Sequence, residues 1–76
     1  MPRINPVSWK KFEKFILYIG FKFVRQKGDH LIYERVDLKR PIVFPKDKEI
    51  PVFIIRNNLR ILNISQEEYI EILKQV

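Results

Sequence analysis

The chain has 76 residues, enough for one small domain whose core can bury only about 60–65% of the surface of the unfolded chain. Lys and Arg number 15 against nine Asp and Glu, and the formal charge of +6 predicts a polyanionic or acidic partner. The absence of Cys excludes disulfides, thiolate metal sites and a Cys nucleophile, and a single His excludes any site that needs two imidazoles.

The opening Met-Pro-Arg-Ile-Asn-Pro lacks the apolar segment of a signal peptide, and no later run approaches the roughly 18 apolar residues of a membrane span. We therefore expect a cytoplasmic protein with no membrane partner. Neither a repeat nor a linker divides the chain, so residues 1–76 are expected to form a single domain. Residues 1–7 carry two prolines and predict an extended N-terminal arm.

A first helix is predicted over residues 9–19. Ser8 is a good N-cap, and Gly20 suits the position that closes a helix. The apolar side chains of this segment fall on one arc of about 120°, which predicts the face that joins the core. They are Trp9, Phe12, Phe15, Ile16 and Ile19.

A hairpin follows, with strands predicted over residues 21–27 and 30–35. The two residues between them, Gly28 and Asp29, favour a type II′ turn, in which the first central residue has positive φ. Simple alternation leaves open which face of the hairpin is buried, because both faces carry apolar and charged residues. One face would hold Phe23 and Ile32, the other Val24, Leu31 and Tyr33.

Residues 40–45 predict a third strand, at an edge of the sheet because prolines lie within it. After a polar loop, Pro51 suits the first turn of a second helix that ends at Asn63 and Ile64. Ser65 and Glu68 form a capping box for a last helical segment. One helix, three antiparallel strands and one or two further helices predict a two-layer α+β fold.

Several short motifs, in their order and spacing, resemble the HicA-type toxins. Gly20-Phe21, Arg25-Gln-Lys-Gly28 and His30-Leu-Ile-Tyr33 are similar to a family pattern of Gly-aromatic, a short strand, Arg-x-x-Gly-Ser-His, two residues and an aromatic. Later segments agree in the same order, and the resemblance covers about residues 9–74. These segments are Ile42-Val-Phe-Pro45, Glu49-Ile-Pro51, Ile55-Arg56 with Leu59, and Ile64-Ser65 with Glu67-Glu-Tyr69.

This resemblance implies a fold similar to a double-stranded-RNA-binding domain. It also implies the toxin of a type II toxin–antitoxin pair, an endoribonuclease that cleaves mRNA and is neutralised by a cognate HicB-type antitoxin. In the family one His carries the ribonuclease activity, and His30 is the residue that matches it. The resemblance implies neither a metal nor a cofactor.

The chain departs from the family pattern at three positions. Asp29 stands where Ser is usual, which places a carboxylate beside the imidazole. Asp47 lies near a loop position where many members carry another His. Asn58 replaces a typically aliphatic residue in the apolar arc of the second helix, so we expect its amide to be hydrogen-bonded or to face a partner.

Cleavage of RNA without a metal needs a base for the 2′-hydroxyl proton, a proton donor for the leaving oxygen, and positive charge at the phosphate. An imidazole exchanges protons near neutral pH, which suits His30 to this chemistry. A two-residue turn would place His30 opposite Lys27, with Arg25 on the same strand face. The missing acid would be a Lys, water or a substrate group.

Further basic residues are candidates for contacts with RNA or a partner. Lys10, Lys11 and Lys14 lie on the polar side of the first helix, where they are either a solvated face or contacts to the RNA backbone. Arg56 and Arg60 are four residues apart on the second helix and suit a phosphate clamp or an antitoxin contact. No residue pattern predicts a metal site or a nucleotide-binding loop.

Two other functions are compatible with the same residues. The chain could be an RNA-binding module of the same fold without activity, which the carboxylate of Asp29 would favour. It could also be an adaptor whose basic surface meets only an acidic protein. The match of His30 to the family's catalytic position favours the toxin.

Overall fold

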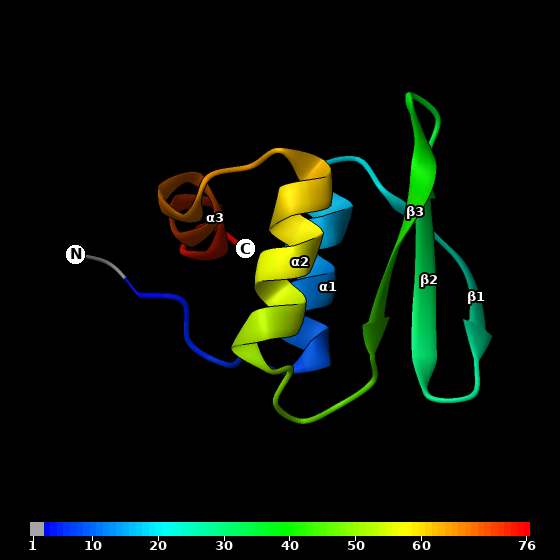
Figure 1. Cartoon of the computed structure of the whole chain (residues 1–76), viewed down its shortest axis with the longest axis horizontal. Coiled ribbons are helices and arrows are strands. Elements are labelled where there is room, and N and C mark those ends of the chain that lie inside the picture. The colour runs from blue at the N-terminus through cyan, green and yellow to red at the C-terminus, as the bar shows by residue number, and fades with distance from the viewer. Residues whose placement is uncertain (1–2) are drawn as a thin grey trace.

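A computed structural model describes residues 3–76 of the chain. The three strands form one antiparallel sheet in the order β1-β2-β3, and Figure 1 shows the helices gathered on one side of it. The two-layer α+β fold predicted from the sequence is confirmed, with two helices after the sheet. The elements are α1 (Trp9–Tyr18), β1 (Lys22–Lys27), β2 (His30–Arg35), β3 (Leu38–Pro45), α2 (Val52–Leu62) and α3 (Gln66–Leu73).

Helix α1 begins and ends as its sequence predicts. The Ser8 side chain accepts a hydrogen bond from the backbone N–H of Lys11 at 3.2 Å, which satisfies one of the free donors of the first turn. Gly20 follows the helix with a φ of +98°, a conformation that a side chain would strain. Phe12, Phe15 and Ile16 are completely buried, so the predicted apolar arc does face the core.

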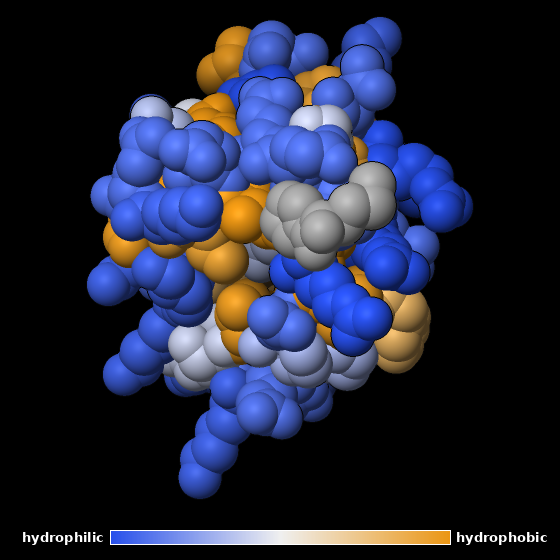
Figure 2. All heavy atoms as spheres, turned by 90° about the vertical axis from the view of Figure 1, so that its left-hand side faces the viewer, coloured by the Kyte–Doolittle hydropathy of each residue, from blue (hydrophilic) through white to orange (hydrophobic). Residues whose placement is uncertain are grey.

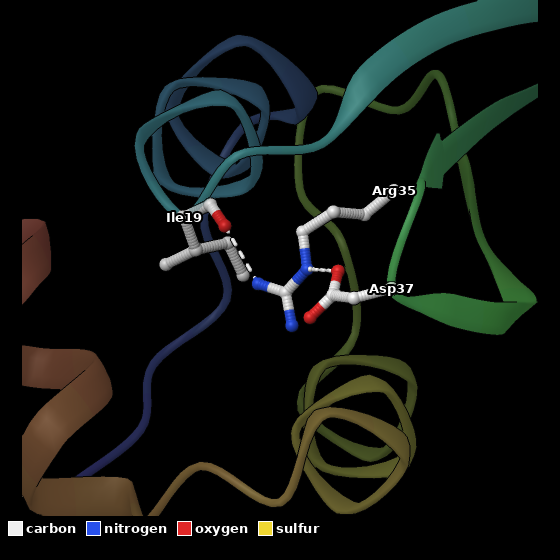
Figure 3. A network of polar contacts seen from close by, with 3 residues as sticks. All are labelled: Ile19, Arg35 and Asp37. Atoms are coloured by element: carbon white, nitrogen blue, oxygen red, sulfur yellow. Dashed lines mark hydrogen bonds and ion pairs between the residues drawn. The ribbon is translucent and has the colours of Figure 1, made fainter.

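Arg35 ties the end of β2 to the end of α1 (Figure 3). Its Nη1 donates to the backbone oxygen of Ile19 at 2.7 Å, and its Nε donates to Asp37 at 2.6 Å. The guanidinium also lies 5.0 Å from the centre of the Phe21 ring. A carbonyl left free by the helix end is thereby satisfied, and the α1–β1 connection is held against the sheet.

The β1–β2 hairpin has the predicted turn but an irregular register. Gly28 has a φ of +61° and Asp29 does not have a positive φ, as a type II′ turn requires. Phe23 pairs with Tyr33, but the next pair joins Arg25 to Ile32, so Val24 forms a bulge. The grouping of Phe23 with Ile32 by simple alternation was therefore wrong, because the extra residue turns Phe23 to the face of Tyr33.

Strand β3 is an edge strand, as its prolines predicted, and it starts at Leu38, two residues earlier than expected. The inner face of the sheet, which the helices cover, is formed by four buried side chains from β2 and β3. They are Leu31, Tyr33, Ile42 and Phe44. The opposite face is open, and residues that alternate with these point to it.

The two C-terminal helices are separated by a sharp turn. Pro51 precedes α2 as its N-cap, one residue before the predicted position within the first turn. Asn63 ends α2 in the left-handed conformation, with a φ of 57°, and Ser65 then accepts from the N–H of Glu68 to cap α3. Asn58 is only 4% exposed, and its amide donates to the backbone oxygen of Val43 at 3.4 Å, as expected for a buried amide.

The described part of the N-terminal arm, residues 3–7, lies against the domain. Ile4 is buried in the core, and Val7 bridges to Ile50, whose N–H donates to the Val7 oxygen at 2.7 Å. Residues 1–2 of the predicted arm lie outside the described residues. Figure 2 looks onto the side of the molecule where the arm and α3 lie, which is mostly hydrophilic with apolar groups between.

A chain of aromatic rings joins the sheet to α1 and α3. Tyr33 stacks on Phe44 with 5.1 Å between ring centres, and Phe44 meets Phe12 edge to face at 4.9 Å. Phe12 adjoins Phe15, which meets Tyr69 edge to face at 4.8 Å. All five rings are buried, and each such pair contributes about 0.5–1.5 kcal/mol beyond the burial of its area.

The two tyrosines of this aromatic chain differ in their hydroxyl groups. The Tyr33 hydroxyl donates to Glu13, whereas the buried Tyr69 hydroxyl has no partner among the described residues. We expect Tyr33→Phe to lower the free energy of unfolding by about 1–3 kcal/mol, because a partly buried carboxylate loses its donor. Tyr69→Phe should change it by less than about 1 kcal/mol. Urea denaturation of both variants measures the difference.

The stability of the same two variants at alkaline pH gives a second test. Burial raises the pKa of Tyr69 from 10 to about 12, and burial together with Glu13 raises the pKa of Tyr33. Because the fold favours the neutral forms, their contribution to stability is complete below pH 10 and is lost as the pH rises toward 12. Tyr69→Phe should weaken this alkaline loss. A large destabilisation by Tyr69→Phe at neutral pH would show that its hydroxyl has a partner.

Candidate active site

His30 is the first residue of β2 and lies at the end of the sheet formed by the hairpin turn. Leu31 and Tyr33 point to the buried face, so His30 and Ile32 point to the open face. The His30 side chain is 54% exposed, and its partner in the register is Lys27. The predicted juxtaposition of one imidazole and one ammonium group across the hairpin is therefore present.

Asp29 contacts the imidazole directly. Its Oδ1 lies 2.9 Å from Nδ1 of His30. The turn that carries Asp29 is held on both sides, since Gln26 donates to the backbone oxygen of Gly28 at 2.8 Å and Lys46 N–H donates to that of Asp29 at 2.7 Å. The carboxylate that replaces the family's usual Ser is thus a neighbour of the imidazole in space as well as in sequence.

Arg25 lies on the same open face as Lys27, two residues along β1, and pairs with Ile32. Both side chains are exposed. Neither forms an ion pair within residues 3–76, so both charges are available to a ligand. Two positive charges therefore lie on the sheet face that carries His30.

Lys46 is a further residue near this site, and sequence reasoning missed it. Its backbone joins the hairpin turn, and its Nζ lies 5.2 Å from the centre of the Trp9 ring. Lys10 lies over the same ring, with its Nζ 5.9 Å from the centre. Two cations therefore lie over the Trp9 ring, and one of them belongs to the residue whose N–H binds the hairpin turn. The signal that could have indicated Lys46 is its position directly after Pro45, because Pro45 is the residue of β3 that pairs with His30.

The three lysines predicted on α1 do not act as one group. Lys10 and Lys14 are both exposed and lie one turn apart on the same side of the helix. Lys11 is half-buried on another side, and its Nζ donates to the backbone oxygen of Val76 at 2.7 Å. Lys11 therefore binds the end of the described chain, whereas Lys10 shares the Trp9 ring with Lys46.

Arg56 and Arg60 are exposed on α2, in a different part of the molecule. Arg60 lines a shallow groove between β3 and α2 together with Arg40, a second basic residue that sequence reasoning missed. Arg40 lies five residues before Pro45, the partner of His30, so the groove is about 16 Å away along the strand. The structure thus contains two separate basic regions.

Asp47, which lies near the family's second His position, is exposed, and its backbone oxygen accepts from the N–H of Trp9 at 3.0 Å. Among residues 3–76, no three or more His, Asp or Glu side chains come together as metal ligands would. None of the helices described here is both long and apolar enough to cross a bilayer.

Comparison with known proteins adds one finding to this geometry. The family model described as "HicA toxin of bacterial toxin-antitoxin" matches residues 9–64, which include α1, the whole sheet, α2 and the His30 turn. Neither the curated proteins nor the solved structures give a significant match. Because the family model spans well over half of the 76 residues, the chain belongs to the HicA family of toxins from bacterial toxin–antitoxin systems.

Proposed function

We propose that this toxin is an endoribonuclease that cleaves mRNA without a metal ion, with His30 as the catalytic residue. The observation that carries the proposal is the environment of His30. An exposed imidazole lies at the end of an open sheet face, opposite Lys27 and close to Arg25, and its Nδ1 is within hydrogen-bond distance of Asp29. Both an acid–base group and phosphate-binding charge are therefore available at one place.

The reaction that suits one imidazole is internal transesterification of RNA. Nε2 of His30 accepts the proton of the 2′-hydroxyl, and the 2′-oxygen forms a bond to phosphorus. The bond between phosphorus and the 5′-oxygen breaks, and the leaving oxygen takes a proton from Lys27, water or the imidazolium. Arg25 and Lys27 stabilise the negative charge on the phosphate oxygens as it develops.

His30→Ala is expected to abolish RNA cleavage and growth inhibition while the protein stays folded. His30 is half-exposed and outside the aromatic chain, so its loss should change stability by no more than about 0.5 kcal/mol. Loss of an acid–base group lowers the rate by about 10²–10⁴-fold. Expression of both proteins in cells, with RNA integrity on gels and melting of the purified proteins, measures this.

Asp47→Asn is the matched control, because it changes an exposed polar residue near the same turn. It should cleave like wild type. An equally fast His30→Ala variant would show that the imidazole is not catalytic. If wild type binds RNA without cleaving it, the chain is instead the inactive RNA-binding module of the same fold.

Binding of RNA is proposed to use the cations of the open face. Each phosphate contact contributes roughly 0.7–0.9 to the slope of log K against log salt, so Arg25→Ala combined with Lys27→Ala should lower that slope by roughly 1.5. Lys39→Ala removes an exposed charge near the far end of β3 and should have little effect. A slope equal to wild type in the double variant would show that neither residue touches the backbone of the RNA.

We further propose that a HicB-like acidic antitoxin binds the α2 region. Arg40 and Arg60 line an open groove together with Ile61, and an adjoining groove that shares Arg40 and Ile61 adds Val43. Arg56 is exposed on α2, one turn before Arg60. A surface of apolar and basic groups suits an acidic protein, which also associates faster through electrostatic steering. The groove lies next to an edge strand, from which a bound partner can extend over the sheet toward His30.

Reversal of charge on α2 is expected to weaken this complex. Arg56→Glu combined with Arg60→Glu should raise the Kd for the antitoxin by about 10–100-fold, because like charges then face each other. Lys10→Glu combined with Lys14→Glu is the matched control, with the same charge change and the same spacing on α1. Calorimetry that gives equal losses for the two pairs would contradict the placement on α2 and indicate a general effect of net charge.

A further inference from the structure

We infer that Asp29 is a positioning residue that selects one tautomer of His30 and leaves Nε2 free to act as the base. This inference rests on the proposed function of His30. The distance of 2.9 Å between Oδ1 of Asp29 and Nδ1 of His30 is that of a hydrogen bond. An ionised carboxylate can only accept, so the proton of the contact lies on Nδ1. In the neutral ring, Nε2 then carries the lone pair.

Hydrogen bonds to the backbone around Asp29 restrain this contact, although the carboxylate is exposed. Asp29 is the second residue of a two-residue turn whose first residue, Gly28, has the positive φ that the turn needs. The Asp29 carbonyl is bound by the N–H of Lys46, and the Gly28 carbonyl by the side chain of Gln26. The main chain on both sides of the carboxylate is therefore restrained, which limits the directions in which its short side chain can point.

The charges near Asp29 leave the carboxylate to the imidazole. Lys27 lies two residues before Asp29 in the chain, and the backbone N–H of Lys46 binds the Asp29 carbonyl. Within residues 3–76, neither lysine forms an ion pair with the Asp29 carboxylate. When Nε2 takes a proton from the 2′-hydroxyl, the imidazolium that forms is stabilised by the adjacent carboxylate, while both ring nitrogens become donors. Asp29 thus acts through His30 and does not itself touch the reacting atoms.

This arrangement gives a chemical role to Asp29, which stands where the family usually has Ser. A Ser hydroxyl can donate or accept, so it does not by itself dictate which ring nitrogen carries the proton. A carboxylate does dictate it. The cost is a negative charge near the phosphate, which the exposed positive charges of Arg25 and Lys27 on the same face oppose.

The tautomer can be measured on the protein alone, because the chain contains a single His. Long-range ¹H–¹⁵N NMR spectra at a pH where the ring is neutral should show the proton mainly on Nδ1 in wild type. In Asp29→Ala it should move mainly to Nε2, the tautomer that an unpartnered imidazole prefers in water. Asp47→Asn makes a similar charge change without touching the ring and should keep the wild-type spectrum. An unchanged tautomer in Asp29→Ala would overturn the inference.

The kinetic arm tests whether the tautomer matters for cleavage. Asp29→Ala should lower kcat roughly tenfold, less than the loss seen when a buried orienting carboxylate is replaced, and should leave RNA affinity equal or slightly stronger. Asp29→Glu should restore part of the rate. A changed tautomer with an unchanged kcat would also overturn the inference. Absence of cleavage by wild type would contradict the proposed function instead, and the NMR spectra would still decide whether Asp29 orients the ring.

Discussion

Contact between aromatic rings across the two layers is the interaction on which this small domain depends. Phe12 of α1 lies between Phe44 of the sheet and Phe15, which in turn meets Tyr69 of α3. In a chain of 76 residues, a few large rings bury area that many small side chains would otherwise have to supply. Because this aromatic chain uses only the inner face of the sheet, the outer face is left without a covering layer.

The open face leaves room for the proposed site around His30 in a domain of this size. The hairpin turn places His30 at the margin of the sheet, where the imidazole is accessible and the strands on both sides restrain its backbone. Arg25 and Lys27 project to the same face because they are two residues apart and pair regularly with Ile32 and His30, between the turn and the bulge at Val24. In a regular strand Phe23 would project to this open face as well, but the bulge pairs it with Tyr33 and turns it to the other face.

Charge in this protein is divided between two regions. One lies at the hairpin, where Arg25 and Lys27 share the face of His30. Lys46, whose N–H binds the turn, lies with Lys10 over the Trp9 ring. The other lies between β3 and α2, where Arg40 and Arg60 line a common groove. With this division, the proposed RNA substrate and the proposed acidic antitoxin need not compete for every cation.

The sequence by itself determined the elements and the position of the imidazole. Helix caps and turns depend on only a few neighbouring residues, so they can be recognised without the rest of the chain. The capping and turn residues here are Ser8, Gly20, Gly28, Asn63 and Ser65. The pairing of His30 with Lys27 also follows from the turn alone. The order of short motifs then indicated the family.

The tertiary structure decided which side chains meet. The bulge at Val24 arises from pairing with β2 and overrides simple alternation, so periodicity misplaced Phe23. Three basic residues make contacts with segments distant in sequence. Lys46 lies over Trp9, Arg40 lines a groove with Arg60, and Lys11 donates to the backbone oxygen of Val76. Such contacts depend on the packing of whole elements around the aromatic chain, which no local pattern of residues specifies.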